Sequence, residues 1–178
     1  MTMRPENQSR ANPPKSIPPM TDAQVTYFWS LVDKEGDCWN WIGYQTGDSG
    51  NGAYGYINLG NPGMFRAHRV AWTLVNGPIP GRLFLDHICH NNACVKPDHL
   101  RLATPMQNGE NRRGARRDSA SGVRGVHWIE AIQKWRAKMN HNNKLVHDKV
   151  YATIEEAEAA LVAKRLELCT HYSPPSAA

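Results

Sequence analysis

Hydrophobic side chains recur at intervals of three and four residues in two segments of the N-terminal half, residues 21–36 and 65–77. This spacing places apolar side chains on one face of a helix. Thr21 and Asp22 can cap the first predicted helix, which we expect to end near Gly36, and Gly77 is a suitable stop for the second. Residues 38–60 alternate aromatic or apolar side chains with Gly, Asn and Asp, a pattern typical of short strands and turns.

Residues 83–113 follow the order strand, loop, strand, helix. An apolar run over residues 83–88 predicts a strand, and a loop rich in Asn and Pro follows it. "LRLAT", residues 100–104, is predicted to return as a second strand. Thr104 then caps a helix in "PMQNGENRR", with Pro105 at the first helical position, where the missing N–H costs nothing.

The C-terminal part has the pattern of a small sheet followed by a helix. Segments 123–129, 134–141 and 144–151 predict three antiparallel strands, and Thr153 with Glu156 forms a capping box for an amphipathic helix. Strand alternation should place three apolar strand residues against three residues of the helix. The strand residues are Val126, Ala137 and Met139, and the helix residues are Ala157, Ala160 and Leu161. Basic and aromatic side chains should then occupy one sheet face.

Changes in composition divide the chain into parts. Residues 1–20 hold five prolines and few apolar side chains, so we expect a flexible arm. We expect one domain over residues 21–113, a Gly, Ser and Arg linker over residues 114–122, a second domain over residues 123–170 and a tail over residues 171–178. The 178-residue chain is long enough for two small domains.

Charge and hydropathy indicate an intracellular protein with a polyanionic partner. The mean hydropathy is −0.59, and no apolar stretch approaches the roughly 20 residues that cross a bilayer. The N-terminus lacks the apolar centre of a signal peptide, so we expect a cytoplasmic location with no membrane partner. The net charge is +5, and arginines cluster at Arg112, Arg113, Arg116 and Arg117. These arginines either neutralise phosphates of a nucleic acid or form a solvated linker.

Three residues in one short loop have the spacing of metal ligands. Cys89, Cys94 and His99 follow a C-x4-C-x4-H pattern, and Cys38 lies upstream in "DCWNW". Three thiolates and one imidazole make a closed tetrahedral zinc site of the structural kind. The alternative is that these are buried thiols and a surface histidine. Cys169, late in the predicted C-terminal helix, is expected to belong to a hydrophobic core.

Asp86 and His87 stand at the end of the predicted strand, directly before the first local ligand. A histidine here can act as a general base, because its pKa near neutrality lets it take a proton from water. The amide oxygen of Asn108 suits a magnesium ion, and Asp86 could be the companion carboxylate. This set suggests phosphodiester hydrolysis with a divalent cation. Taken alone, an Asp-His pair more often belongs to an ordinary surface turn.

The segment "DHICHNNACVKPDHLRLATPMQN" resembles the core of zinc-bearing HNH nucleases of the ββα-metal kind, which include His-Cys box homing endonucleases and many phage enzymes. "FWSLVDKEGDCWNWIG", "AHRVAW" and "NGPIPG" extend the resemblance over about residues 24–113. It implies His87 as general base, Asn108 and Asp86 as ligands of Mg²⁺ or Mn²⁺, and a structural Zn²⁺ held by the three cysteines and one histidine of the predicted cage, Cys38, Cys89, Cys94 and His99. His99 stands where zinc-free phage enzymes usually have Asn.

The C-terminal landmarks "SGVRGV-W", "KWRAKM" and "T-EEA-AA" resemble the Apetala-two (ethylene-response-factor) DNA-binding domain. In that family a three-stranded sheet enters the major groove and a helix packs behind it. The resemblance implicates in DNA binding Arg124, Trp128, Lys134, Trp135, Arg136 and Lys138. The alternative for each tryptophan is a place in the core. "DKVYAT" departs from the family, which usually has Gly and then Phe there.

The sequence thus predicts an α+β protein with a ββα-metal HNH nuclease domain and a three-stranded antiparallel sheet packed by one helix. The predicted function is a site-specific, phage-encoded, homing-type endonuclease that cuts double-stranded DNA, with a homodimer as one route to double-strand cleavage. One alternative is a non-catalytic DNA-binding regulator on a zinc-stabilised scaffold. Another is an RNA-directed nuclease. The role of Arg69 in "AHRVAW" stays open between a phosphate contact and a helix surface.

Overall fold

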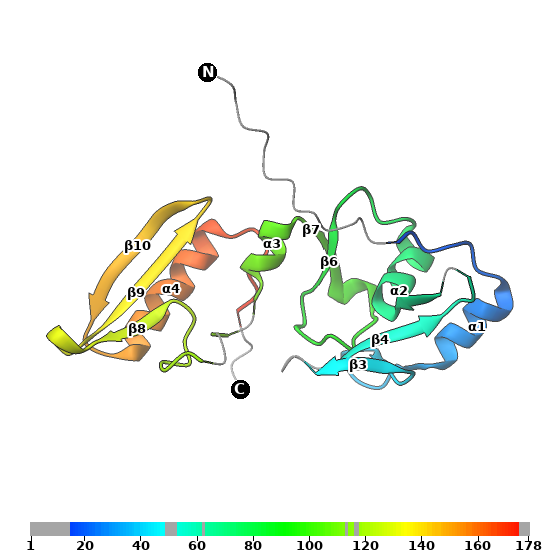
Figure 1. Ribbon diagram of the computed structural model, residues 1–178, viewed down its shortest axis with the longest axis horizontal. Helices are drawn as coiled ribbons and strands as arrows, with labels where there is room; N and C mark the ends of the chain where they lie inside the picture. Colours follow the sequence, from blue (N-terminus) through cyan, green and yellow to red (C-terminus); the bar gives the residue numbers. More distant parts are fainter. Residues whose placement is uncertain (1–14, 49–52, 62, 113, 116–117, 175–178) are drawn as a thin grey trace, which may run out of the picture. The chain divides into compact units, whose positions relative to one another are not determined.

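The computed structural model describes residues 15–48, 53–61, 63–112, 114–115 and 118–174 (Figure 1). The fold mixes helices with small sheets, whose strand orders are β1-β2, β3-β4-β5, β6-β7 and β10-β9-β8. Contacts along the chain divide it into two compact units. The first contains residues 1–83 and 91–102, and the second contains residues 84–90 and 103–178.

The first unit begins with one helix and two short sheets. Its elements are α1 (Asp22–Ser30), β1 (Val32–Asp33), β2 (Asn40–Trp41), β3 (Gln45–Asp48), β4 (Ala53–Asn58), β5 (Met64–Arg66), α2 (Ala67–Asn76), the 3-10 helix η1 (Pro97–His99) and the start of β7 (Leu100–Ala103). The β1-β2 and β3-β4-β5 pairs are antiparallel. Gly77, with φ of 81°, ends α2, which confirms the predicted stop.

The core of the first unit surrounds Trp41, which is 1% exposed. Phe28 of α1 packs on it with ring centroids 5.1 Å apart, and Val70 of α2 belongs to the same cluster. Two glycines admit the indole, because a Cβ on Gly55 or Gly43 would lie 2.4 Å or 2.8 Å from it. Within residues 38–60, the glycines at positions 43 and 55 therefore leave the space that the buried indole of Trp41 fills.

The first helix ends earlier than its sequence pattern predicts. The pattern continues to Val32 and suggests a stop near Gly36, but α1 ends at Ser30, and the Leu31 N–H bonds to the Phe28 carbonyl. Val32 instead pairs with Trp41 between β1 and β2. Sheet pairing buries Val32 to 9% exposure, so its apolar side chain fills the core from a strand.

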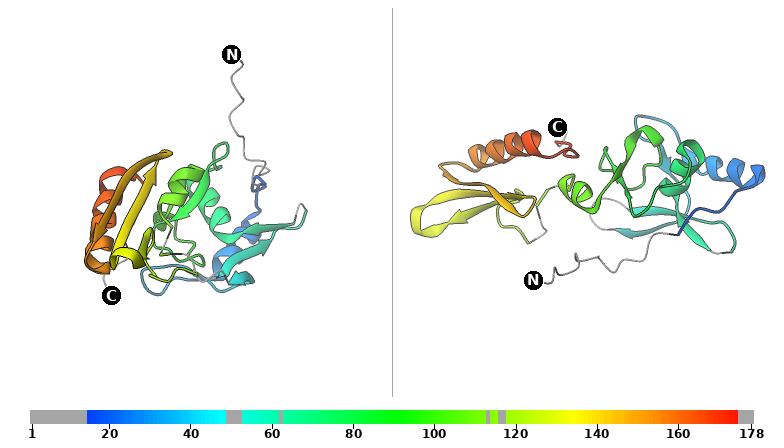
Figure 2. Two further views of the ribbon diagram at one scale, coloured as in Figure 1. Left: turned by 60° about the vertical axis from the view of Figure 1, so that its left-hand side comes forward. Right: turned by 90° about the horizontal axis from the view of Figure 1, so that it is seen from above.

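The second unit contains β6 (Phe84–His87), α3 (Pro105–Glu110), β8 (Val126–Ile129), η2 (Glu130–Ile132), β9 (Lys134–His141), β10 (Lys144–Tyr151) and α4 (Ile154–Leu168). Both helices begin with a capping box, at Thr104 with Gln107 and at Thr153 with Glu156. The three predicted strands and the predicted C-terminal helix are confirmed. In Figure 2, α4 lies along one face of the β8–β10 sheet.

Strand alternation in the second unit places the predicted apolar residues against α4. Val126 pairs with Ala137 across β8 and β9, and the buried cluster joins them to Met139, Ala157 and Leu161. Ala160, the remaining residue predicted for this contact, is half-buried. Within the part of the chain that is described, no helix is long and apolar enough to cross a membrane.

Candidate nuclease and metal sites

Backbone pairing brings Cys38 to the loop that carries Cys94, although 55 residues separate them in the chain. The Trp41 N–H bonds to the Ala93 carbonyl at 2.9 Å, and the Val95 N–H bonds to the Trp39 carbonyl at 2.8 Å. These bonds flank an antiparallel bridge between Asn40 and Cys94. Cys38 therefore reaches the loop through a strand-like contact that local spacing does not reveal.

Cys38, Cys94 and His99 offer three possible metal ligands whose donor atoms lie within 4.8 Å of one another. The Nδ1 atom of His99 is 3.6 Å from Sγ of Cys38 and 3.7 Å from Sγ of Cys94. The possible ligand group also includes Cys89, five residues before Cys94. All four cysteines of the chain lie in its described part and are thiols.

Asp86 and His87 end the strand β6, where their exposed fractions are only 7% and 6%. The side chain of Asn111, the residue that ends α3, meets this strand end. Its Nδ2 donates to Oδ1 of Asp86 and to the backbone carbonyl of His87, both at 3.0 Å. Asn111 is itself 4% exposed, so these bonds are formed away from water.

Sequence reasoning selected Asn108 and missed Asn111. Asn108 is exposed on α3, and Asn111 follows it by three residues, which is the spacing of neighbours on one helix face. Two asparagines at this spacing were the sequence signal that could have drawn attention to Asn111 as well. Only the folded chain shows that the buried amide of Asn111 contacts Asp86, and the role of Asn108 as a cation ligand stays a prediction.

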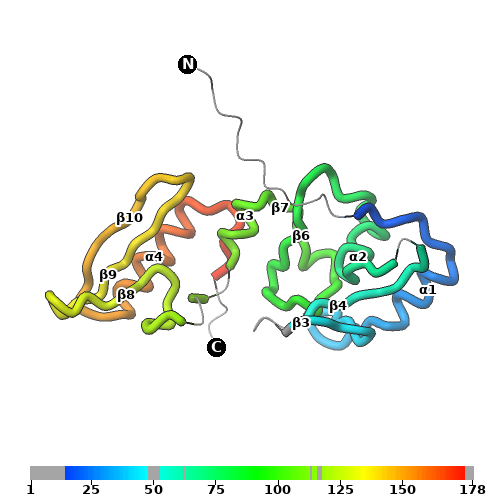
Figure 3. Tube along the Cα trace, viewed as in Figure 1, coloured from blue at the N-terminus to red at the C-terminus, as the bar shows by residue number. Residues whose placement is uncertain are grey.

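The segment after α4, which includes the first residues of the predicted tail, packs against the end of α3. The Ser173 N–H donates to Oδ1 of Asn111 at 3.0 Å, and His90 Nε2 lies 3.2 Å from the Ser173 carbonyl. Gln107 Nε2 donates to Oγ1 of Thr170 at 3.3 Å. The Cα trace in Figure 3 shows this segment returning from α4 to α3. Residues up to Ser173 are therefore part of the ordered second unit.

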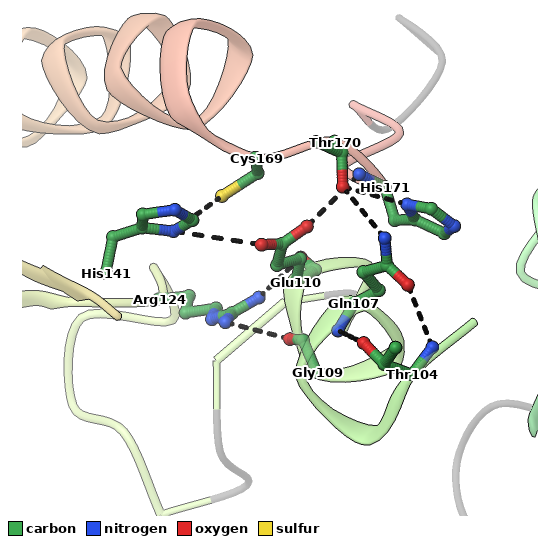
Figure 4. A network of polar contacts seen from close by, with 9 residues as sticks. All are labelled: Thr104, Gln107, Gly109, Glu110, Arg124, His141, Cys169, Thr170 and His171. Carbon is green, nitrogen blue, oxygen red and sulfur yellow. Dashed lines mark hydrogen bonds and ion pairs between the residues drawn. The ribbon is translucent and has the colours of Figure 1, made fainter. Parts of the chain in front are cut away.

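Arg124 caps α3, whereas the sequence assigned it to DNA. Its guanidinium donates to the carbonyls of Gly109 at 3.0 Å and of Glu110 and Arg112 at 3.1 Å (Figure 4). Gly109 and Glu110 are the last two residues of α3, where carbonyls lack partners within the helix ladder, and Arg112 follows the helix. Burial, followed by the charge of Arg165, lowers the pKa of Arg124. Three hydrogen bonds therefore engage the guanidinium of Arg124 with the chain itself, and its DNA contact stays a prediction.

Trp128 and Trp135 pair with each other across β8 and β9, with ring centroids 5.1 Å apart. By strand alternation they share the face of Val126 and Ala137, which is the face that packs on α4. Trp135 packs against this core, while Trp128 remains 39% exposed. A place in the hydrophobic core was the alternative prediction for each tryptophan. Trp135 occupies such a place.

The opposite face of the sheet carries the basic residues of β9, Lys134, Arg136 and Lys138, which alternate with the inward ones. Arg136 is engaged there in a two-pronged ion pair, with both bonds to Asp148 at 2.5 Å. The hydrogen bond from Arg136 lowers the pKa of the Asp148 carboxyl. Arg112 is exposed, whereas Arg113, Arg116 and Arg117 lie outside the described residues.

Comparison with known proteins relates the region that contains Asp86, His87 and the cysteine loop to nucleases. The sequence profile of the HNH endonuclease family matches residues 65–110. An uncharacterised HNH endonuclease of Acanthamoeba polyphaga mimivirus is 30% identical over 126 residues, which cover 70% of this chain and 64% of that protein.

Two proteins of Escherichia phage T7 are also similar. Protein 3.8 is 34% identical over 79 residues, covering 44% of this chain and 64% of that protein. Protein 7.7 is 33% identical over 75 residues, covering 42% of this chain and 54% of that protein. The chain thus spans just under two thirds of the first two relatives' length. No solved structure is significantly similar to it. The match to the HNH endonuclease family lies within residues 65–110.

Proposed function

We propose that the protein is a DNA endonuclease that hydrolyses phosphodiester bonds with a divalent cation. The observation that carries the proposal is the meeting of β6 and the end of α3, where Asp86 and His87 lie beside Asn111. The HNH match over residues 65–110 supports it, because Asp86, His87 and Asn108 all fall within those residues.

Asp86 and Asn108 are the proposed ligands of the catalytic cation. A carboxylate and an amide carbonyl are hard oxygen donors, and Mg²⁺ or Mn²⁺ prefers such donors. Asn111 donates to Asp86 Oδ1, which orients the carboxylate as second-layer bonds orient metal ligands in general. A cation bound there supplies charge stabilisation to the phosphate and to the departing sugar oxygen.

His87 is the proposed general base. Its imidazole takes a proton from water as the water oxygen bonds to phosphorus and the bond from phosphorus to a sugar oxygen breaks. The backbone of His87 is held on one side by Asn111 and on the other by the His90 N–H, which bonds to the same carbonyl at 3.1 Å. Two donors on one carbonyl fix the strand end that presents the imidazole.

We propose that Cys38, Cys89, Cys94 and His99 hold one structural zinc ion. A tetrahedral zinc separates a sulfur and a nitrogen ligand by about 3.6 Å. The distances of 3.6 Å and 3.7 Å from His99 to Cys38 and Cys94 fit that geometry. Cys89 lies only five residues from Cys94, within the reach of one loop. Four protein ligands would leave no open position, so this ion would support the fold.

The open face of the C-terminal sheet is the proposed DNA contact. Lys134, Arg136 and Lys138 share that face, and exposed Arg112 adds a further charge. Such residues bind phosphates with a strong dependence on salt. The Apetala-two resemblance is consistent with this face. Homing-type site choice, and a homodimer for cutting both strands, belong to the same proposal, since one catalytic centre cuts one strand at a time.

Cleavage of supercoiled plasmid with Mg²⁺ tests the proposal. The parent should cut duplex DNA, and EDTA should stop it. Replacing the base, His87→Ala, should slow cleavage by about 10²- to 10⁴-fold. His90→Asn is the matched control, because asparagine tolerates the left-handed φ of 57° at this position while the imidazole is removed.

Three outcomes would overturn parts of the proposal. A folded His87→Ala protein that cuts at the parent's rate would remove His87 from the mechanism. A parent that binds DNA but never cuts it would favour the regulator. Preferential cleavage of RNA in a mixed competition would favour an RNA-directed nuclease.

A further inference from the structure

A second group of possible metal ligands lies at the end of α3 and includes no residue of β6. Its members are Glu110, His141 and Cys169, whose ligand atoms lie within 4.8 Å of one another. The Nδ1 atom of His141 is 3.7 Å from Oε1 of Glu110 and 4.0 Å from Sγ of Cys169. Figure 4 shows His141 between the other two, with one contact to Glu110 and one to Cys169.

Three different elements place these side chains. Glu110 is the last residue of α3, His141 the last of β9, and Cys169 the residue that ends α4. The Cys169 N–H bonds to the Arg165 carbonyl at 2.8 Å, which completes the final turn of α4. Because each ligand stands at the end of a regular element, its backbone is fixed without a long loop.

Other bonds hold the carboxylate of Glu110 in place. The His171 N–H donates to Oε2 at 3.1 Å, and Oε1 faces His141. The side chain is 7% exposed, so the carboxylate is removed from most of the solvent. Arg124 fixes the backbone at the same point through the carbonyls of Gly109 and Glu110. The ligand atoms are therefore oriented before any ion arrives.

We propose that Glu110, His141 and Cys169 bind a zinc ion. Carboxylate, imidazole and thiolate are all zinc ligands, and a thiolate disfavours Mg²⁺ and Ca²⁺. In a tetrahedral zinc site a nitrogen ligand lies about 3.3 Å from an oxygen ligand and about 3.6 Å from a sulfur ligand. The observed 3.7 Å and 4.0 Å are a few tenths of an ångström longer, so the side chains would move together slightly on binding. Three protein ligands leave the fourth position to water. An adjoining cavity of about 410 Å³ has room for it. Besides the three ligands, its lining includes four basic residues, Arg112, Arg124, Lys138 and Arg165.

A zinc ion here would tie the end of α3 to the C-terminal sheet and helix. Asn111, which contacts Asp86, directly follows the ligand Glu110. The site would thus steady the helix end that touches the proposed catalytic strand. The inference does not depend on nuclease activity, because it concerns metal binding by residues outside the proposed cage and the proposed centre.

Counting zinc in the full-length protein tests the inference. Protein purified with zinc and dialysed against metal-free buffer should hold about two ions per chain, one in each group. Cys169→Ser and His141→Ala should each remove about one ion. His171→Ala is the matched control, since it keeps the backbone N–H that bonds Glu110, and it should hold the parent's zinc.

The serine variant separates a metal site from a plain polar network. Serine can keep a hydrogen bond to His141, so a network without zinc would survive Cys169→Ser with an unchanged metal count. Cobalt substitution gives a second readout that does not depend on stability: thiolate-to-cobalt absorption should fall in Cys169→Ser. Equal zinc and equal cobalt absorption in the parent, Cys169→Ser and His141→Ala would overturn the inference.

Discussion

The two groups of possible metal ligands differ in how the chain assembles them. In the first unit, Cys94 and His99 come from one short loop, and a single backbone bridge brings in Cys38. In the second unit, Glu110, His141 and Cys169 come from the ends of three elements spread over about 60 residues. Spacing along a chain reveals ligands of the first kind, because a loop joins them. It does not reveal the second kind, since tertiary packing alone joins those.

The difference also concerns what each group supports. Cys94 is fully buried and adjoins Val95, which packs in the core of the first unit. Cys169 is half-buried at the rim of the C-terminal core. An ion in the first group would therefore stabilise a whole unit, whereas an ion in the second would fix the relative place of three element ends.

The largest expected effect is the loss of stability in Cys94→Ser. A unit of about 95 residues, the size of the first one, loses about 4–8 °C in unfolding midpoint for each kcal/mol, and a structural zinc contributes several kcal/mol. We expect the midpoint temperature of unfolding to fall by roughly 10 °C or more in Cys94→Ser and by only a few degrees in Cys169→Ser. Thermal unfolding followed by circular dichroism measures both. Equal falls would contradict the distinction between the two groups.

The next prediction separates Asn111 from Asn108. Asn111→Ala removes two buried hydrogen bonds to the strand end and should cost about 2–3 kcal/mol of unfolding free energy. Asn108→Ala changes an exposed side chain and should cost less than about 0.5 kcal/mol, while cleavage should fall and need more Mg²⁺. Urea unfolding and cleavage across Mg²⁺ concentrations give the two readouts.

An Asn108→Ala protein that cuts like the parent at every Mg²⁺ concentration would contradict the role of Asn108 as a cation ligand. Together with an inactive but folded Asn111→Ala protein, it would transfer the role of cation ligand from Asn108 to Asn111. An Asn111→Ala protein with unchanged stability would instead show that its bonds to Asp86 and His87 contribute nothing to the folded state.

Most elements could be predicted because local chemistry determines them. The capping boxes at Thr104 and Thr153, Pro105 at the first helical position and Gly77 after α2 are signals within a few residues. The end of α1 was missed because Val32 satisfies a helical pattern and a strand pairing equally well. Only the contact with Trp41, nine residues away, decides between them.

The candidate sites were predictable to the extent that their residues lie in one segment. Asp86, His87, Cys94 and His99 could be selected from spacing. The contacts of Arg124 with α3 could not be predicted, because its partners are backbone carbonyls that every sequence contains. Asn111 was missed for a related reason: its selection depends on Ser173 and Asp86, which flank it from distant parts of the chain.

The smallest expected effect concerns the ion pair on the sheet. The pKa of the Asp148 carboxyl is lowered by its bond to Arg136, so the pair is intact above the usual pKa of aspartate. It is lost only as pH falls through the lowered value. At neutral pH Asp148 thus competes with DNA phosphates for Arg136. Asp148→Asn should tighten DNA binding a few-fold, measured by fluorescence anisotropy at fixed salt.

Glu167→Gln is the matched control for that measurement, because it breaks a similar exposed pair, with Lys164, on α4. It should leave DNA affinity unchanged. Weaker binding in Asp148→Asn would show that Asp148 supports the DNA contact, and would remove the open sheet face from the proposal in its present form.

Chemical rescue of the missing base tests the central claim most directly. His87→Ala leaves a space beside the proposed cation ligands, and imidazole added to the buffer can enter it and accept the proton. We expect the slow cleavage by His87→Ala to rise with imidazole concentration, while Asp86→Ala gains nothing and the parent is unaffected. Cleavage by His87→Ala at the parent's rate without imidazole would contradict the account.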